Sequence, residues 1–192
     1  TIYLLNEKIF NYSELGVESN KINQININHR LTYKSIIDFV LNNNITGYII
    51  FSNADIYFDD TIEKVFNTSL SCSRIFYSQL RIEDKTKKLF GPNSWSQDSW
   101  IFHTKIFQNK IDTSKVNFCL GLPGCDNRFV YELKCQNIQL FNEPLFIKTY
   151  HIHDTQIRNY THKDKISPPY LQIIPYVGPD YKLFYEKKKK YK

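Results

Sequence analysis

Hydrophobic and polar residues follow two periods along this chain, one typical of strands and one typical of helices. Apolar runs and strict alternation predict strands, whereas apolar residues spaced at i, i+3 and i+4 predict amphipathic helices. The predicted strands are 2–5, 22–28, 47–51, 56–58, 74–83, 88–90, 100–102 and 145–150. The predicted helices begin after Thr32, within 59–61 and at Asp126, because threonine and aspartate are good caps for the first turn.

The order of these elements is β-β-α-β-β-α-β-β-β-α-β. Strand and helix alternate in the first half, which favours a parallel sheet. The middle of the chain adds antiparallel pieces, including a hairpin with its tip at 83–86. The run 47–51 is continuously apolar, which is typical of the centre of a parallel sheet. We therefore expect an α/β fold with a central mixed, mostly parallel sheet flanked by helices.

The length of the chain fits one domain followed by a tail. A chain of 192 residues is close to the size of a single average domain. Residues 1–160 carry the periodic elements and are predicted to form that domain. Residues 161–192 contain several prolines and little periodicity, and they end in a lysine block. We expect them to wrap the domain as an extended segment and to finish as a basic, disordered tail.

The positive charge of the chain is concentrated at its end. The formal net charge is +6, and the five lysines at 187–190 and 192 supply most of it. The body is therefore nearly neutral, and a lysine run is typical of a solvated terminus. Anchoring to nucleic acid or to an anionic membrane is the alternative interpretation. No RNA-binding or helix-turn-helix pattern accompanies the run, so we expect no specific nucleic-acid partner.

Other features of the composition exclude further classes. No apolar run reaches the ~20 residues that a membrane-spanning helix needs, and the first residues lack the pattern of a signal peptide. The four cysteines have neither CxxC nor zinc-finger spacing, which predicts free thiols in a reducing, cytoplasmic compartment. The chain has no methionine, even at position 1, so we expect it to begin inside a longer or processed product, with room for fusion to further domains.

The strongest chemical signal lies where the 47–51 strand ends. Asn53, Ala54 and Asp55 follow, and the i, i+2 spacing puts Asn53 and Asp55 on one face. Open α/β sheets bind ligands at the carboxyl ends of central strands, where hard oxygen ligands suit Mg²⁺ or Mn²⁺ shared with phosphates. The alternative is a plain turn between strand and helix. The immediate second strand at 56–58 favours a functional role.

A glycine-rich loop precedes a second candidate, Asp126. The loop Gly121-Leu-Pro-Gly124 lets the backbone approach a ligand closely. A carboxylate at the start of the following helix can accept a proton from a substrate hydroxyl. The alternative is that Asp126 only caps that helix.

Two histidines follow the last predicted strand. Strand alternation puts His151 and His153 on one face, a pattern that suits a metal or diphosphate site. Ordinary surface or core histidines are the alternative.

Weaker candidates are Asn6 at the end of the first strand, Arg30 and Tyr33 before the first helix, and Lys148 in the last strand. Each can contact a nucleotide or its phosphates, and each can equally be a surface residue. Trp95, Asp98 and Trp100 place an acid between two aromatic rings, which suits sugar binding because aromatic faces pack on apolar sugar faces. The alternative puts both tryptophans in the core and Asp98 in a turn.

Taken together, these segments resemble the GT-A family of glycosyltransferases. Asn53-Ala54-Asp55 resembles the Asp-X-Asp metal motif of that family, with asparagine in place of the first aspartate. Gly124-Cys125-Asp126 resembles the acidic motif that opens the helix carrying the catalytic base of inverting members. His151 or His153 resembles the late metal-binding histidine. The resemblance covers about residues 1–160 and implies a Rossmann-like GT-A fold.

The resemblance also implies an activity. A sugar would move from a nucleoside-diphosphate donor, a UDP-sugar in the first instance, to a hydroxyl of a glycan or other acceptor, with inversion. Mn²⁺ or Mg²⁺ would be held by Asp55 with His151 or His153, and Asp126 would be the catalytic base. The residues expected to contact the nucleotide are Asn6, Arg30, Tyr33, Asn53, Ala54 and Lys148, and those expected to contact the sugars are Trp95, Asp98 and Trp100.

Three other functions fit parts of the pattern. A nucleotidyltransferase uses the same strand end, but it would have a glycine-rich phosphate loop after the first strand, which this chain lacks. A non-catalytic nucleotide-sugar-binding module would bind the donor without releasing a nucleoside diphosphate. A nucleic-acid-binding protein would show steep salt dependence that disappears when residues 187–192 are deleted.

Overall fold

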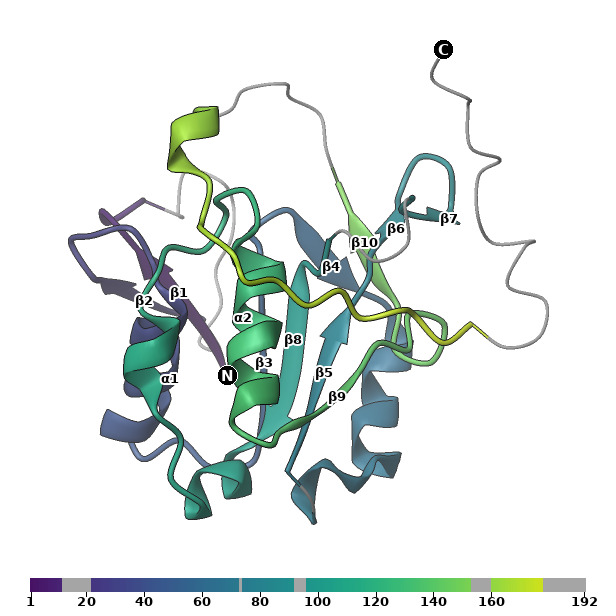
Figure 1. Ribbon diagram of the computed structural model, residues 1–192, viewed down its shortest axis with the longest axis horizontal. Helices are drawn as coiled ribbons and strands as arrows, with labels where there is room; N and C mark the ends of the chain where they lie inside the picture. Colours follow the sequence, from purple (N-terminus) through teal and green to yellow (C-terminus); the bar gives the residue numbers. More distant parts are fainter. Residues whose placement is uncertain (12–21, 73, 92–95, 153–159, 178–192) are drawn as a thin grey trace.

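The structure is a computed structural model that describes residues 1–11, 22–72, 74–91, 96–152 and 160–177 (Figure 1). These residues form a mixed α/β fold, as the sequence predicts. The helices are α1 (Tyr33–Asn42) and α2 (Cys125–Cys135), and the short 3-10 helices include η2 (Asp60–Asn67) and η3 (Ser69–Ser71). The strands form one sheet of two and two sheets of four.

The sheets divide the strands into three groups. The parallel pair is β1 (Ile2–Asn6) with β2 (Ile22–Asn26). One four-stranded sheet has the order β3-β8-β5-β9, with β3 (Tyr48–Ser52), β8 (Ser99–His103), β5 (Ile75–Gln79) and β9 (Gln139–Phe141). The third sheet has the order β4-β10-β6-β7, with β4 (Ile56–Phe58), β10 (Thr149–His151), β6 (Ile82–Glu83) and β7 (Lys88–Leu89).

Strand direction departs from the predicted, mostly parallel sheet. Strand β8 pairs antiparallel with both β3 and β5, whereas β5 and β9 are parallel. The chain passes from β5 to β8 through the β6–β7 hairpin without a crossover helix, and such connections produce antiparallel neighbours. The prediction that the 47–51 run is a central strand is wrong, because β3 lies at one edge of its sheet and its residues are half-buried. Strand β9, which has only three residues, was not predicted.

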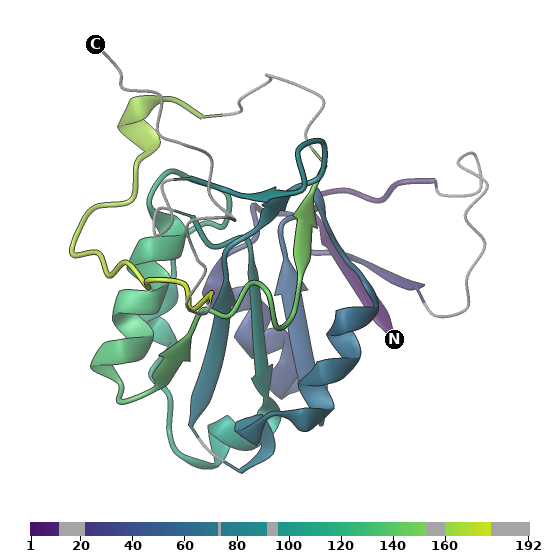
Figure 2. The ribbon, with the colours of Figure 1, turned by 90° about the vertical axis from the view of Figure 1, so that its right-hand side faces the viewer.

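The two faces of the β3-β8-β5-β9 sheet belong to different hydrophobic cores, because successive side chains of a strand point to opposite faces. Phe76, Trp100 and Phe102 join the core formed with α1 and α2, and Ile101 joins the core formed with η2 and η3. Figure 2 shows this sheet edge-on between α2 and η2. Burying both faces in this way is the usual solution for a sheet in an α/β domain.

The helix starts follow the sequence in two cases out of three. Thr32 caps α1 by accepting from the Ser35 N–H, as predicted. Asp59 accepts from the Thr61 N–H at 2.9 Å, but the helix that it caps is the 3-10 helix η2. The prediction that Asp126 caps α2 is wrong, because Gly124 holds the N-cap position with φ 79°. Asp126 therefore lies inside the first turn, and its side chain is available for another contact.

After the short 3-10 helix η6 (His162–Asp164), the chain crosses the outer side of α2 as an extended segment up to residue 177 (Figure 1). The Ile166 N–H donates to Pro123 O at 3.0 Å, and the Leu171 N–H donates to Asn127 O at 3.0 Å. Farther along, the Tyr176 N–H donates to Asn142 O at 2.7 Å. The expected wrapping segment is thus present up to residue 177, and the predicted disordered lysine tail lies outside the described residues. Within the described part of the chain, no helix combines the length and apolar character needed to cross a membrane.

Candidate active site

The turn after β3 fixes the position of Asp55. The Asn53 N–H donates to Asp98 O at 3.0 Å, which holds the end of β3 against the segment before β8. The Ile56 N–H then donates to Asn53 O at 3.3 Å, and the chain reverses into β4. Strand β4 pairs antiparallel with β10, where Ile56 lies opposite His151. Local turn geometry and sheet register together bring the Asn53–Asp55 turn next to the end of β10.

His151 lies between two carboxylates, and we call Asp55, Glu83 and His151 the histidine cluster. Its Nε2 is 3.0 Å from Asp55 Oδ2, and its Nδ1 is 3.3 Å from Glu83 Oε2. The His151 side chain is 9% exposed and that of Asp55 is 44% exposed. The cluster therefore has a buried imidazole that presents one ring nitrogen beside a carboxylate open to solvent.

Arg81 connects the histidine cluster to Asp98. Its Nε donates to Glu83 Oε1 at 2.8 Å and its Nη1 donates to Asp98 Oδ2 at 2.8 Å, while the guanidinium lies over the Phe90 ring. Burial alone would raise the pKa of Glu83, but hydrogen bonds and charge from Arg81 and His151 outweigh burial and hold it below its usual value. Glu83 is thus a carboxylate that stays ionised beside His151 Nδ1.

Asp98 is a buried centre of hydrogen bonds. Asp98 is only 6% exposed, and its Oδ1 accepts a hydrogen bond from Asn53 Nδ2 at 2.9 Å. Its Oδ2 accepts from Arg81 and also from Ser96 Oγ at 2.9 Å. Both carboxylate oxygens are therefore already engaged, and the expectation that Asp98 contacts a sugar does not fit this arrangement.

Asp126 forms a separate part of the site, which we call the Asp126 corner. Its Oδ2 accepts from the Gln97 N–H at 2.9 Å. Burial raises the pKa of Asp126 to about 6, backbone hydrogen bonds from Gln97 and Asn127 oppose this rise, and the charge of Asp98 adds to it. A carboxyl group with a pKa near neutrality is well suited to accept and release a proton in catalysis.

Two aromatic candidates turn out to be core residues. Tyr33 has no exposed surface, its ring stacks on Phe129 with centroids 4.0 Å apart, and its hydroxyl donates to Cys125 Sγ at 3.5 Å. Trp100 is 1% exposed and stacks on Phe51. The predicted ligand contacts of Tyr33 and Trp100 are therefore corrected, because periodic packing of α1 and β8 points both rings inward.

The remaining nucleotide candidates lie in different places. Arg30 Nη2 donates to Gly121 O at 3.3 Å, so Arg30 does reach the glycine-rich loop. Asn6 Nδ2 donates to Gln24 Oε1 at 2.9 Å and ties β1 to β2. Ala54 is exposed in the turn before Asp55. The Lys148 N–H donates to Thr61 Oγ1 at 2.8 Å. Burial opposes ionisation of Asp59 at the start of η2, but hydrogen bonds from Thr61 and Tyr150, with the charge of Lys148, outweigh burial and lower its pKa.

Two other candidates, Trp95 and His153, lie outside the described residues.

Arg81 and Glu83 were not identified as site residues from the sequence. Both fall in a run that was assigned to one long strand, and strand alternation alone does not reveal that β6 pairs in parallel with β10. Only that pairing puts Glu83 opposite His151.

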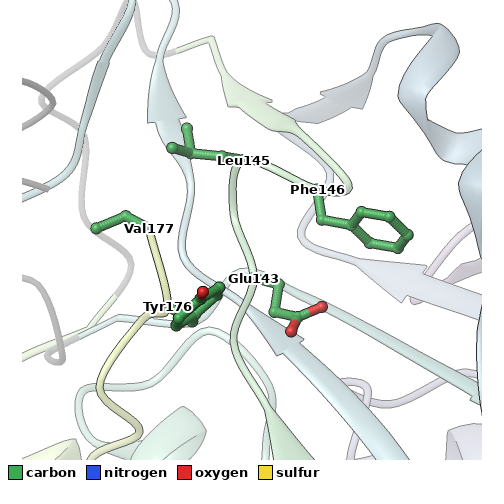
Figure 3. Close-up of a pocket in the computed structure, with 5 residues that line it drawn as sticks. All are labelled: Glu143, Leu145, Phe146, Tyr176 and Val177. Carbon is green, nitrogen blue, oxygen red and sulfur yellow. The ribbon is translucent and has the colours of Figure 1, made fainter. Parts of the chain in front are cut away.

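A hollow of about 290 Å³ lies elsewhere, between the β9–β10 connection and the C-terminal segment (Figure 3). Its lining residues are Glu143, Leu145, Phe146, Tyr176 and Val177. None of the candidate site residues lines it, and its lining is mainly apolar. The candidate reactive site is therefore formed by the carboxylates at Asp55, Glu83 and Asp126, and this hollow is not part of it.

The histidine cluster contains side chains that the sequence predicts as ligands of a divalent cation. No group of three or more histidine, cysteine or acidic side chains is arranged to hold a metal ion within the described ranges. Asp55 Oδ2 and His151 Nε2 are nevertheless 3.0 Å apart. An octahedral ion with ligands at about 2.1 Å keeps neighbouring ligand atoms about 3 Å apart. The separation of these two atoms equals that spacing, and it is also the length of an ordinary hydrogen bond between the two side chains.

The chain was also compared with known proteins. No model of a known family, no curated protein and no solved structure matches it.

Proposed function

We propose that this chain is a metal-dependent glycosyltransferase that moves a sugar from a nucleoside-diphosphate donor to a hydroxyl of a glycan or other acceptor. The observation that supports the proposal most is that the short segment Ser96–Asp98 contacts both the turn before Asp55 and the Asp126 carboxylate. The two acidic sites at its ends differ in exposure. Asp55 with His151 supplies two ligands beside a strand end, and Asp126 supplies a carboxyl with a pKa of about 6. A cation site for the diphosphate and a base for the acceptor are what this reaction needs.

The Asp126 carboxylate takes the proton in the proposed reaction. The acceptor oxygen forms a bond to the anomeric carbon while the bond from that carbon to the diphosphate oxygen breaks, and the hydroxyl proton passes to Asp126. Attack opposite the leaving group inverts the configuration of the sugar. The Gln97 N–H, 2.9 Å from Asp126 Oδ2, holds the carboxylate in one orientation.

Mn²⁺ or Mg²⁺, when bound, would neutralise the charge that develops on the leaving diphosphate. Asp55 and His151 are the residues that would hold it. Glu83, which is held ionised, can only accept a hydrogen bond, so Nδ1 of His151 would carry the proton and Nε2, beside Asp55, would be the ligating nitrogen. Arg81 in turn neutralises Glu83 and fixes it. We keep Arg30, which reaches the glycine-rich loop, and Ala54, which is exposed in the turn before Asp55, as donor contacts, whereas the Asn53 amide donates to Asp98.

We further propose that the protein works in the cytoplasm. Cys72, Cys119, Cys125 and Cys135 are all free thiols, as expected in a reducing compartment.

A thermal-shift screen tests the function. UDP-, GDP- and dTDP-sugars are added to the protein with and without Mn²⁺, because a ligand that binds the native state raises its melting temperature. One nucleotide class should raise the melting temperature only when Mn²⁺ is present. Asp55→Asn should remove that metal-dependent rise, and Asp60→Asn, an exposed acid in η2, should keep it.

A chain that shows no metal-dependent rise with any donor contradicts the proposal. A chain that shows the rise is then incubated with donor and a mixture of glycan acceptors, and nucleoside diphosphate release is measured. Release supports the transferase. Binding without release indicates the alternative of a non-catalytic nucleotide-sugar-binding module.

A further inference from the structure

The segment Ser96–Asp98 touches both parts of the candidate site, and we call it the bridge segment. At one end, the Gln97 N–H donates to Asp126 at 2.9 Å. At the other end, Asp98 O accepts from the Asn53 N–H, two residues before Asp55. The Asp98 N–H donates to Gln79 O at 3.2 Å and anchors the segment to the end of β5. A shift of the bridge segment would therefore move both ends of the site.

The Asp98 carboxylate is what holds the bridge segment in place. It accepts one hydrogen bond from Asn53 on Oδ1 and two, from Arg81 and Ser96, on Oδ2. The donors come from three different parts of the chain, the β3 turn, the start of β6 and the bridge segment itself. Ser96 Oγ also accepts from Arg81 Nη1 at 3.2 Å, which closes the set. Charge-assisted hydrogen bonds of this kind are stronger and more directional than neutral ones.

We propose that Asp98 is a positioning residue that couples the two ends of the site, orienting Asp126 through the Gln97 N–H and the Asp55 turn through Asn53. The inference rests on the function proposed above. It assigns Asp98 no contact with the substrate, because both carboxylate oxygens are engaged by the protein.

Asp98 also acts on Asp126 through its charge. Asp98, which lies before β8, raises the pKa of the Asp126 carboxyl by its charge, and Tyr33 on α1 and Cys125 on α2 are the other titratable groups whose pKa Asp126 affects. Burial raises the pKa of Tyr33 well above its usual value and that of Cys125 to about 11, so both are neutral near pH 7. Arg128, on the same helix, directs its guanidinium to Glu132 and to the carbonyls of Ser167 and Pro168. Asp98 is then the negative charge that disfavours ionisation of Asp126.

The same arrangement explains the asparagine at position 53. Its amide donates to a carboxylate that already carries a negative charge. An aspartate there would place two carboxylates in contact, which is strongly unfavourable for the ionised pair. We therefore expect Asn53→Asp, although it restores the Asp-X-Asp pattern, to impair the site rather than improve it.

The experiment uses Asp98→Asn, with Asp38→Asn on α1 as the matched control for loss of one negative charge. The Asp126 carboxyl is titrated in the ligand-free protein by carbon-13 NMR, and the pH profile of kcat/KM is measured for nucleoside diphosphate release. Asp98→Asn should lower the midpoint of the Asp126 titration and move the acidic limb to lower pH, each by roughly 0.5–1 pH unit. It should also lower kcat by roughly tenfold or more. Asp38→Asn should change neither quantity.

A second variant separates position from charge. Asn53→Ala keeps the charge of Asp98 and the backbone hydrogen bond from residue 53 to Asp98 O, but it removes the side-chain hydrogen bond to Asp98 Oδ1, so kcat should fall while the acidic limb stays in place. This variant also serves if Asp98→Asn does not fold. Asp98 is not a positioning residue if its asparagine variant leaves both midpoints unchanged, if Asp38→Asn shifts them equally, or if Asn53→Ala leaves kcat unchanged. The NMR titration needs no activity, so it separates failure of this inference from failure of the proposed function.

Discussion

The carboxylates of the histidine cluster and of the Asp126 corner differ in their exposure to solvent, and the pKa shifts of Glu83 and Asp126 have opposite directions. Asp55 is 44% exposed and contacts a histidine, and Glu83 is held ionised by Arg81. Asp126 instead lies at the start of α2, where burial raises its pKa to about 6. The difference separates two tasks within one network of acids. Solvated, paired carboxylates can hold a cation, whereas a buried one can exchange a proton near neutral pH.

The largest expected effect breaks the Asp126 corner alone. Asp126→Asn keeps the shape of the side chain but cannot accept a proton, so transfer should fall about 10²- to 10⁴-fold. Donor binding should stay within a factor of about 2 in calorimetry with Mn²⁺, because the histidine cluster is intact. Undiminished nucleoside diphosphate release by this variant would exclude Asp126 as the base.

The next effect is on stability, and it tests the raised pKa of Asp126 directly. A folded-state pKa above the unfolded value of 3.8 means that ionisation favours the unfolded chain as the pH rises. The cost is absent below about pH 4, grows between about pH 4 and 6, and amounts to up to about 3 kcal/mol above pH 6.

Asp126→Asn should therefore be more stable than the parent chain at pH 7.5, and the difference should shrink as the pH falls towards 4. Urea denaturation at a series of pH values measures it. A difference in stability that does not depend on pH would show that Asp126 titrates normally and would remove the contrast between the two regions.

A third variant tests the histidine cluster without altering Asp55 or His151, the two proposed ligands. Glu83→Gln weakens the partner of His151 Nδ1, so Mn²⁺ affinity in the presence of UDP should fall about 10- to 100-fold. Calorimetric titration with Mn²⁺ measures this. The control is Glu63→Gln in the first turn of η2, which should bind Mn²⁺ like the parent chain. Equal affinities for both variants would mean that Glu83 does not orient His151.

The smallest expected effect concerns the glycine-rich loop that precedes Asp126 and ends at the N-cap residue Gly124. Gly124 has φ 79°, and a Cβ there would lie 3.1 Å from Tyr170 Oη and 3.2 Å from its ring. Gly124→Ala should therefore destabilise the fold by about 1–2 kcal/mol. Gly91→Ala, with nothing within 4 Å of the added carbon, is the matched control and should cost little. Chemical denaturation compares the two, and equal costs would mean that the α2 start tolerates a side chain.

Local sequence signals were sufficient for most elements of the fold. Thr32 followed by apolar residues at helical spacing gave α1 with its cap, and the 83–86 turn signal gave the β6–β7 hairpin. These features depend on neighbours within a few residues, which a sequence pattern contains. The antiparallel pairing of β8 was not predictable in this way, because strand direction depends on how the whole chain returns to the sheet.

The sequence alone determined which residues could carry chemistry, namely Asp55 after β3, Asp126 after the glycine-rich loop and His151 in the last strand. Only the tertiary structure decided how they are used. Asp55 and His151, which are 96 positions apart in the chain, meet in the fold, and Glu83 reaches His151 from 68 positions away. Arg81 and Asp98 join them through further side-chain contacts. It also moved Tyr33 and Trp100 into the core. Charge pairing and burial act through space, so separation along the chain cannot reveal which acid is solvated and which is desolvated.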